Sequence, residues 1–196
     1  MIRDLFDQIL ALVGIVLLLP LFIIIPVWIV LDSRGGAFYI QKRIGKGGKP
    51  FGLIKFRTMR PASDQKGKLT VGNRDPRITP AGYVLRKYKL DELPQLFNVL
   101  KGEMRFVGPR PEVEEYVRLY TSKQRRVLSV KPGITDYASL KYFEESELLA
   151  KSDNPRQTYI DEIMPEKINI NLEYLRRKSF SEDLRIILKT IGRIFS

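Results

Sequence analysis

The stretch ILALVGIVLLLPLFIIIPVWIVL, residues 9–31, runs for 23 residues without a charged side chain. As an α-helix that rises about 1.5 Å per residue, it would match the roughly 30 Å hydrocarbon thickness of a lipid bilayer. A cleaved signal peptide is the competing interpretation, but the run is long for one and no Ala-x-Ala-like cleavage site follows it. The stretch therefore predicts that the protein contacts a membrane.

Two prolines, Pro20 and Pro26, interrupt this apolar run. Each removes a backbone N–H donor, so we expect a kink near the middle of the segment. A kinked helix that crosses the bilayer is the simplest interpretation. A helix-break-helix with Pro20 at its apex, which enters and leaves the bilayer by the same face, is the alternative. Charges of both signs flank the run on both sides and give no signal for its orientation.

The composition of the 196-residue chain limits its chemistry. The chain has no cysteine and no histidine, which excludes disulfides, thiol nucleophiles, imidazole bases and metals held by thiolate or histidine. Any nucleophile, acid or base must come from Asp, Glu, Lys, Tyr, Ser or Thr, and any metal must prefer oxygen ligands, as Mg²⁺ does. The formal net charge of +12 predicts an anionic partner: nucleic acid, anionic lipid or a phosphorylated small molecule.

After the apolar run, residues 38–58 are typical of a β-hairpin with a glycine-rich turn at 45–48. Lys55 and Arg57 stand two residues apart and would share one face of a strand. Two interpretations stay open, a solvated basic hairpin on anionic lipid and an anion-binding site. The segment from 37 to 62 has no acidic residue, and its basic residues are Lys42, Arg43, Lys46, Lys49, Lys55, Arg57 and Arg60.

The chain as a whole predicts an α+β fold that is mainly helical, with a membrane segment over 1–36 and one further domain over 37–196. A polar loop with turn signals at 73–76 is expected over 61–80. An amphipathic helix is expected over 181–195, either packed on the domain or lying on the bilayer surface. Further helices are expected just after Pro80 and over 91–100, 112–127 and 139–150.

Asp91 and Glu92 stand shortly before Pro94, in the sequence LDELPQ. Because proline is tolerated in the first turn of a helix, the pair is expected at a helix N-terminus, where the backbone dipole is positive. Acidic residues at that position commonly only cap the helix, which is the simplest interpretation. In a chain without His or Cys, however, a carboxylate is the leading nucleophile, since it can attack phosphorus to give an acyl phosphate.

Basic residues near this pair indicate a phosphate site. Arg86 precedes the pair, Arg105 follows it, and the motif Gly108-Pro109-Arg110-Pro111 comes after one helix and a turn. The glycine permits a close backbone approach, the prolines stiffen the loop and the arginine can grip a phosphate bidentately. A rigid surface turn with a solvated arginine is the alternative. Carboxylates beside a phosphate call for Mg²⁺, so Asp91 and Glu92 are also the candidate metal ligands.

These motifs resemble those of the bacterial sugar transferases, the small monotopic phosphoglycosyl transferases that start glycan assembly on polyprenyl phosphate. The most specific block is LDELPQLFNVLKGE over 90–103, followed by VGPRP over 107–111. The resemblance covers nearly the whole chain, from Phe6-Asp7 and Pro20 to the 179–190 stretch.

The resemblance implies ping-pong chemistry at an Asp-Glu dyad. Asp91 would attack the sugar-linked phosphate of a UDP-sugar, UMP would leave, and a polyprenyl phosphate, expected to be undecaprenyl phosphate, would take the phosphosugar. Glu92 would help to hold Mg²⁺ or assist the acceptor. The basic hairpin, the arginine motif and the resemblance together name as candidate substrate-binding residues Lys55, Arg57, Arg86, Gly108, Arg110 and Pro111.

The resemblance also implies a re-entrant helix broken at Pro20, with amphipathic interfacial helices and the catalytic domain on the cytoplasmic face of the bacterial inner membrane. The implied partners are UDP-sugar, polyprenyl phosphate and membrane lipids, without nucleic acid; the oligomeric state stays open, a dimer included. The chain departs from the family at Leu19, where many members have serine. It also departs at residues 136–144, DYASLKYFE, a segment that we expect to help select the sugar.

Two other function classes are compatible with the composition. A membrane-tethered basic protein that binds nucleic acid or anionic lipid without catalysis would tolerate Asp91→Asn with little change. A structural subunit held by one spanning helix would place its two termini on opposite faces of the membrane.

Overall fold

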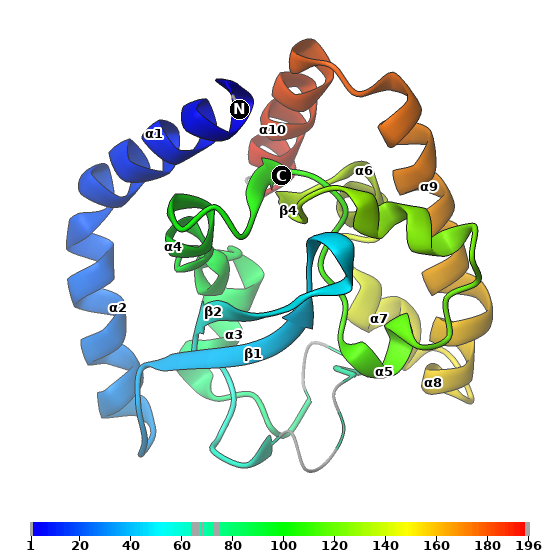
Figure 1. Ribbon diagram of the computed structural model, residues 1–196. Coiled ribbons are helices and arrows are strands. Elements are labelled where there is room, and N and C mark those ends of the chain that lie inside the picture. The colour runs from blue at the N-terminus through cyan, green and yellow to red at the C-terminus, as the bar shows by residue number, and fades with distance from the viewer. Residues whose placement is uncertain (1, 64–66, 68, 73–74, 195–196) are drawn as a thin grey trace.

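The apolar run forms two helices, α1 (Ile2–Leu17) and α2 (Leu19–Asp32), bent by 63° at Leu18 in the computed structural model, which describes residues 2–63, 67, 69–72 and 75–194 (Figure 1). Pro20 lies in the first turn of α2, where it has no N–H for the carbonyl of Val16 and its ring crowds that carbonyl. No single helix in the described part of the chain is long and apolar enough to cross a membrane, although the bent pair together meets that test by length and composition. The expected helix-break-helix is present, with its break two residues before Pro20.

One side of this bent pair packs on the rest of the protein. Ala11 of α1 is fully buried in a cluster with Leu96 and Val99, and Ile29 of α2 is buried in a second cluster with Leu85. Burial of such side chains stabilises the contact by about 25 cal/mol for each Å² of apolar surface removed from water. The two helices are therefore part of the core on their inner side.

The outer side of the pair is apolar and exposed, and α10 (Phe180–Ile194) extends it. The rings of Phe6 and Phe180 meet edge to face with centroids 5.6 Å apart, which joins the two helical surfaces. An exposed apolar area this extended suits contact with lipid. The amphipathic helix predicted over 181–195 is confirmed as far as Ile194, and Phe195 lies outside the described residues. This outer apolar surface comprises Leu5, Phe6, Ile9, Leu12, Val16, Leu17, Leu19, Ile23, Ile24, Val27, Trp28, Val30, Leu31, Phe180, Leu184, Leu188 and Ile191.

The predicted hairpin is confirmed. Strands β1 (Phe38–Ile44) and β2 (Pro50–Phe56) pair antiparallel across a turn, η1 (Lys46–Gly48), in which Gly47 takes a φ of 68°. That left-handed conformation is open to glycine without the penalty that a Cβ brings. The glycine-rich turn thus sets the register of the hairpin.

A second pair of strands was not predicted. β3 (Arg105–Val107) and β4 (Gly133–Thr135) run parallel, and Gly108, which follows β3, lies close to Gly133, the first residue of β4. A Cβ on Gly133 would lie 2.1 Å from the backbone nitrogen of Gly108. Both glycines are therefore needed for a close crossing of two backbones.

Three predicted helices are wrong in extent. The helix expected over 91–100 begins as a 3₁₀ turn and becomes α-helical only after Pro94, which has no backbone N–H to donate. The helices of the described residues after the hairpin are α3 (Pro80–Lys87), η3 (Leu90–Glu92), α4 (Gln95–Leu100), α5 (Glu114–Val117), η4 (Gln124–Ser129), α6 (Tyr137–Lys141), α7 (Glu145–Ala150), α8 (Pro155–Thr158), the π-helical turn η5 (Tyr159–Ile163), α9 (Met164–Arg177) and α10.

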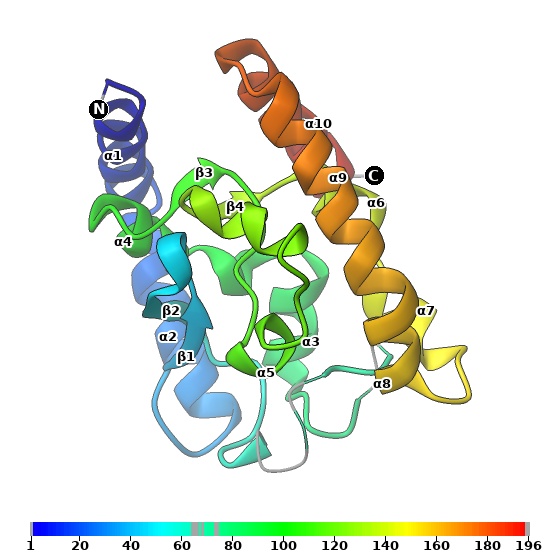
Figure 2. The same cartoon turned by 45° about the vertical axis from the view of Figure 1, so that its right-hand side comes forward.

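The helices predicted over 112–127 and 139–150 also differ from the observed ones for local reasons. Over 112–127, tighter i→i−3 backbone bonds at Leu119 and Tyr120 end α5 after one turn and place Tyr120 in the core. Over 139–150, Asp136 caps α6 early by accepting a bond from the backbone of Ser139, and the helix ends at Tyr142 before α7 begins. The helices α8 and α9 were not predicted; α9 lies on the opposite side of the molecule from α2 (Figures 1 and 2).

In the 61–80 loop, Asp75 accepts hydrogen bonds from the backbone and the guanidinium of Arg77. The turn expected at 73–76 includes residues 73 and 74, which lie outside the described residues.

Asn98 fixes the hairpin to the segment that carries Asp91 and Glu92. Its amide is completely buried, accepts from the backbone nitrogen of Ile54 at 3.0 Å and donates to the carbonyl of Gly52 at 2.7 Å. A second bond, from Nδ2 to Glu103 at 2.7 Å, satisfies the remaining donor. Since a buried amide is costly when unpaired, this clamp ties β2 to α4 in one register.

Candidate active site

Asp91 and Glu92 lie in the turn η3, directly after Lys89, whose φ of 54° makes the chain reverse sharply. The pair precedes the six-residue α4 rather than opening a long helix, so the expected contribution of a helix dipole is small. Asp91 is buried, and no described residue donates a hydrogen bond to its carboxylate. Its negative charge therefore faces the interior without a direct partner.

Glu92 is held by cations from two other parts of the fold. Lys55 Nζ of β2 lies 3.3 Å from Glu92 Oε1, and Arg110 Nη1 lies 3.2 Å from Glu92 Oε2. Arg110 Nη2 also donates to Glu92 Oε1, so the guanidinium grips the carboxylate with two nitrogens. This bidentate grip is the strong form of a charge-assisted hydrogen bond.

The pKa values of the two neighbouring carboxyl groups shift in opposite directions. Burial raises the pKa of Asp91 above its ordinary value, and the charge of Glu92 acts in the same direction against the lowering effect of Lys55. Burial alone would also raise the pKa of Glu92, but Arg110 and Lys55 outweigh it and hold that pKa well below its ordinary value. Glu92 therefore stays ionised to lower pH than Asp91, and Asp91 takes up a proton first as the pH falls.

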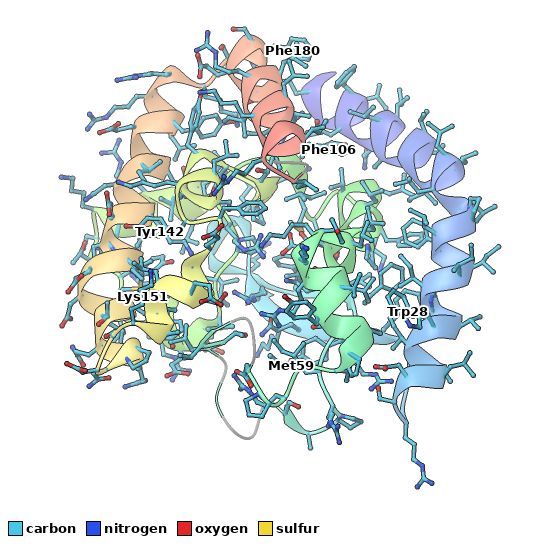
Figure 3. All side chains as sticks on the ribbon, turned by 180° about the vertical axis from the view of Figure 1, so that it is seen from behind. Trp28, Met59, Phe106, Tyr142, Lys151 and Phe180 are labelled. Carbon is cyan, nitrogen blue, oxygen red and sulfur yellow. The ribbon has the colours of Figure 1, made fainter. Side chains whose placement is uncertain are left out.

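A cavity of about 950 Å³ extends from these charged groups to α1. Arg86, Asp91 and Arg110 line its charged part, while Leu10 and Val13 of α1 line an apolar part. Met59, Phe106 and Tyr142, which also line it, are labelled in Figure 3 and stand in three different directions around the interior. The cavity therefore offers an anionic group a basic wall and an apolar chain a route along α1.

The loop that carries Arg110 is supported from both sides. Arg43 of β1 donates to the carbonyl of Pro111 at 3.0 Å, and the backbone nitrogen of Arg110 donates to Asp136 at 2.9 Å. Asp136 is completely buried and was not predicted as a site residue. Its position before a helix, with Ser139 three residues later, is a capping signal in the sequence, but the contact with Arg110 spans 26 residues.

The structure brings some of the predicted residues together and not others. Lys55, Arg57, Arg86, Arg110 and Pro111 all line the cavity, and Arg86 donates to Thr70 at 3.1 Å. Gly108 does not line it, because its close approach is to the backbone of β4.

Arg105, expected near the phosphate, is engaged elsewhere. Its Nε lies 2.6 Å from Asp7 of α1, in a buried ion pair. It therefore fastens α1 to β3.

Arg57 also lines the cavity, and its guanidinium has a structural role that was not predicted. β2 ends at Phe56, and the guanidinium of Arg57 turns to the C-terminal end of α2. It donates to the carbonyl of Gly36 at 2.5 Å, and to Oγ and the carbonyl of Ser33, each at 2.8 Å. A cation at the negative end of a helix dipole is stabilising, so Arg57 anchors α2.

The carboxylates fit a metal ion only in part. No group of three or more Asp and Glu residues that could hold a metal occurs among the described residues. Both oxygens of Glu92 already accept bonds from Arg110, whereas the Asp91 carboxylate is open to the cavity. A Mg²⁺ ion could thus take one protein carboxylate here and must draw its other ligands from substrate and water.

The family model described as bacterial sugar transferase matches residues 1–196. The chain belongs to this family. A putative undecaprenyl-phosphate N-acetylgalactosaminyl 1-phosphate transferase of Bacillus subtilis is 45% identical over 111 residues, which cover 57% of this chain and 62% of the relative. The UDP-glucose:undecaprenyl-phosphate glucose-1-phosphate transferase of Xanthomonas campestris pv. campestris is 37% identical over 192 residues, or 96% of this chain and 37% of the relative.

A third member of the sugar transferase family, the exopolysaccharide production protein ExoY of Sinorhizobium fredii, is 33% identical over 204 residues. The match covers 96% of this chain and 83% of ExoY. This chain thus spans less than two thirds of the first two relatives and most of the third.

Arg57→Met should destabilise this sugar transferase. It leaves the carbonyl groups of residues 33 and 36 without their donor, so we expect a loss of about 2–4 kcal/mol in the free energy of unfolding. Arg34→Met, which removes an exposed guanidinium near the same helix end, is the matched control and should change it by less than about 0.5 kcal/mol. Urea unfolding in detergent, followed by the fluorescence of the single tryptophan, Trp28, measures both. Equal stability of the two variants would contradict the anchoring role.

Proposed function

We propose that this protein transfers a sugar 1-phosphate from a UDP-sugar to a polyprenyl phosphate, most simply undecaprenyl phosphate, as the first membrane step of glycan assembly. One observation carries the proposal: the Asp91 carboxylate, without a hydrogen-bond donor among the described residues, faces a cavity that joins a basic wall to the apolar side of α1. The basic wall suits a diphosphate and the apolar part suits an isoprenoid chain. The names of the Bacillus and Xanthomonas relatives support the same reaction class.

The proposed reaction has two displacements at phosphorus. In the first, an oxygen of Asp91 forms a bond to the β-phosphorus of the UDP-sugar, the bond from that phosphorus to the bridging oxygen breaks, and UMP leaves with that oxygen. In the second, a phosphate oxygen of the polyprenyl phosphate attacks the same phosphorus, and the Asp91 carboxylate leaves. The product is a polyprenyl diphosphate sugar, and the enzyme returns to its initial state.

Asp91 suits the role of nucleophile better than Glu92 does. The lone pairs of Glu92 are engaged by Lys55 and Arg110, which lowers its basicity. Asp91 has no such donor and a raised pKa, so its carboxylate is the more basic of the two. Glu92 instead holds Lys55 and Arg110 where they can stabilise negative charge on the phosphoryl group in the transition state.

We propose Mg²⁺ as the cofactor. Asp91 and the substrate diphosphate would supply its ligands together with water, and Glu92 would remain a neighbour held by its two cations. When bound, the ion would neutralise charge on the diphosphate and on the departing UMP.

We also propose that α1 and α2 form a re-entrant element in the bacterial inner membrane, with the catalytic domain on the cytoplasmic face. The 63° bend, the exposed apolar outer side and the anchoring of both helices to the domain support it. UDP-sugars are cytoplasmic, so the cavity must open on that side.

Asp91→Asn should abolish covalent labelling. When the protein in detergent is incubated with Mg²⁺ and a panel of UDP-sugars, its intact mass should rise by one sugar phosphate, and Asp91→Asn should show no such increase. The same substitution should lower kcat/KM for UMP release at least about 1000-fold. Asp161→Asn, an exposed control, should behave as the native protein does. No UMP release from any sugar, even with undecaprenyl phosphate present, would rule the proposed function out.

The acid limb of the pH profile of kcat/KM should reflect the ionisation of Asp91. Its reactive form is ionised and its pKa is raised, so kcat/KM should fall on the acid side at a higher pH than an ordinary aspartate gives, about 3.9. Lys55→Met removes a cation that lowers this pKa, and the limb should move to still higher pH. If the acid limb of the kcat/KM profile keeps its position or moves to lower pH in Lys55→Met, the limb does not reflect the ionisation of Asp91.

Cysteine labelling can test the re-entrant topology, because the chain has no cysteine of its own. Arg3→Cys and Arg34→Cys place one thiol on either side of the apolar run, both at exposed positions. A membrane-impermeant maleimide should modify neither in intact spheroplasts and both after lysis. Labelling of one position in intact spheroplasts would instead indicate a spanning segment.

A further inference from the structure

Lys89 is a cation of the cavity that no carboxylate of the described residues pairs with. Its side chain is half-buried and lines the cavity that Asp91 also lines, and its Nζ makes no ion pair or hydrogen bond within the described part of the chain. Lys55 and Arg110, by contrast, are both engaged by Glu92. A partly desolvated ammonium group without a counter-ion is costly, and in a binding cavity it is expected to meet an anion.

The backbone at Lys89 is unusual for a residue that has a Cβ. Its φ of 54° lies in the left-handed region, and residues held there cluster at functional sites, where the surrounding structure enforces the conformation. The carbonyl of Lys89 accepts from the backbone nitrogen of Glu92 at 3.2 Å. The turn that holds the carboxylate pair therefore also places the ammonium group.

An aromatic ring holds the Lys89 ammonium group in the cavity. Lys89 Nζ lies over the ring of Phe143, 4.7 Å from its centroid, and Phe143 also lines the cavity. The guanidinium of Arg193 on α10 lies over the same ring at 5.2 Å and pairs with Glu144, the next residue, at 3.7 Å. A ring attracts a cation without neutralising its charge, so Lys89 stays available to an anionic ligand.

Among the cations around Asp91, Lys89 is a more distant one. Lys55 and Arg86 each lower the pKa of Asp91 more than Lys89 does, because their charges act on its carboxyl group more strongly. In a displacement at phosphorus, the attacking and the leaving oxygen lie roughly in line on opposite sides of the phosphorus. With Asp91 as the nucleophile, a cation set back from its carboxylate suits the leaving oxygen.

We infer that Lys89 binds the phosphate of the donor that leaves as UMP and stabilises the charge formed there in the first displacement; this inference rests on the proposed function. When the bond between the β-phosphorus and the bridging oxygen breaks, its electron pair stays on that oxygen, and the UMP phosphate gains one negative charge. The ammonium group keeps its proton and stabilises this charge electrostatically. In the second displacement the leaving group is the Asp91 carboxylate, so Lys89 has no such part in it.

Separate measurement of the two half-reactions tests the inference. The protein in detergent is mixed with Mg²⁺ and the UDP-sugar that the native protein uses fastest, without polyprenyl phosphate, and the first release of UMP is timed by rapid quench. Lys89→Met removes the charge and should slow this release about 100-fold. Lys89→Arg keeps the charge and should stay within about tenfold of the native rate. Lys87→Met, at an exposed lysine outside the cavity, is the matched control and should stay within about twofold.

The second half-reaction starts from the enzyme that carries the phosphosugar. Native protein and Lys89→Met are loaded by prolonged incubation with the UDP-sugar, checked by intact mass, freed of UMP by desalting and mixed with undecaprenyl phosphate. Transfer of the phosphosugar by Lys89→Met should stay within about threefold of the native rate, because no charge forms on a nucleotide in this step.

Several results would overturn the inference and leave the proposed function standing, since the native protein would still release UMP. An unchanged first step in Lys89→Met is one, and a loss in Lys89→Arg as large as in Lys89→Met is another. Equal loss in both half-reactions would assign Lys89 a structural role, and loss confined to the second would assign it to the acceptor phosphate. No UMP release by the native protein from any UDP-sugar overturns the proposed function and the inference with it.

Discussion

The carboxylate of Glu92 binds Lys55 from the hairpin and Arg110 from the 108–111 loop, and the geometry of the site depends on this double contact. Three segments distant in sequence meet at one largely buried anion, the Glu92 carboxylate. The two cations more than compensate its charge, so it can stay ionised away from water. The neighbouring Asp91 is then left as the carboxylate without a donor, which is why two adjacent acids have opposite pKa shifts.

The helices α1 and α2 are fastened to the same site. Asp7 of α1 pairs with Arg105 at the start of β3, and Arg57 holds the end of α2 at the end of the hairpin. Each half of the bent pair is therefore fastened to a strand that leads into the site. The two helices, bent by 63°, expose an apolar surface on one side, and α1 lines the cavity on the other. A soluble donor and a lipid acceptor could thus reach Asp91 from different directions.

Sequence reasoning succeeded where the signals were local. The glycine turn at 45–48 predicted the hairpin, and the apolar periodicity after Phe180 predicted α10. The sequence did not predict the role of a residue where a contact with a residue far away in the sequence determines that role. Nothing near Arg57 in the sequence indicates that its partners lie on residues 33 and 36, and the alternation of a strand suggested the face of Lys55 instead.

Gly108 is a second residue whose contacts with distant segments were not predictable from the sequence. A Cβ on Gly108 would lie 2.8 Å from the carbonyl oxygen of Lys131 and 3.1 Å from the backbone nitrogen of Gly133, so its need for a small side chain comes from a strand pairing that was not predicted. The sequence indicates that Asp136 caps a helix, but it does not indicate the hydrogen bonds of Asp136 with Arg110 and Asn171, which form only in the folded chain. Arg86, Arg110 and the carboxylate pair were found because their residue types and close spacing already indicated phosphate chemistry.

The central claim is that Asp91 carries the phosphosugar between two separate displacements. Isotope exchange tests it most directly: radiolabelled UMP is mixed with enzyme, Mg²⁺ and the best UDP-sugar, with no polyprenyl phosphate present. A covalent intermediate predicts that label enters the UDP-sugar with the native protein and not with Asp91→Asn. Exchange that requires polyprenyl phosphate, or that persists in Asp91→Asn, would contradict the account.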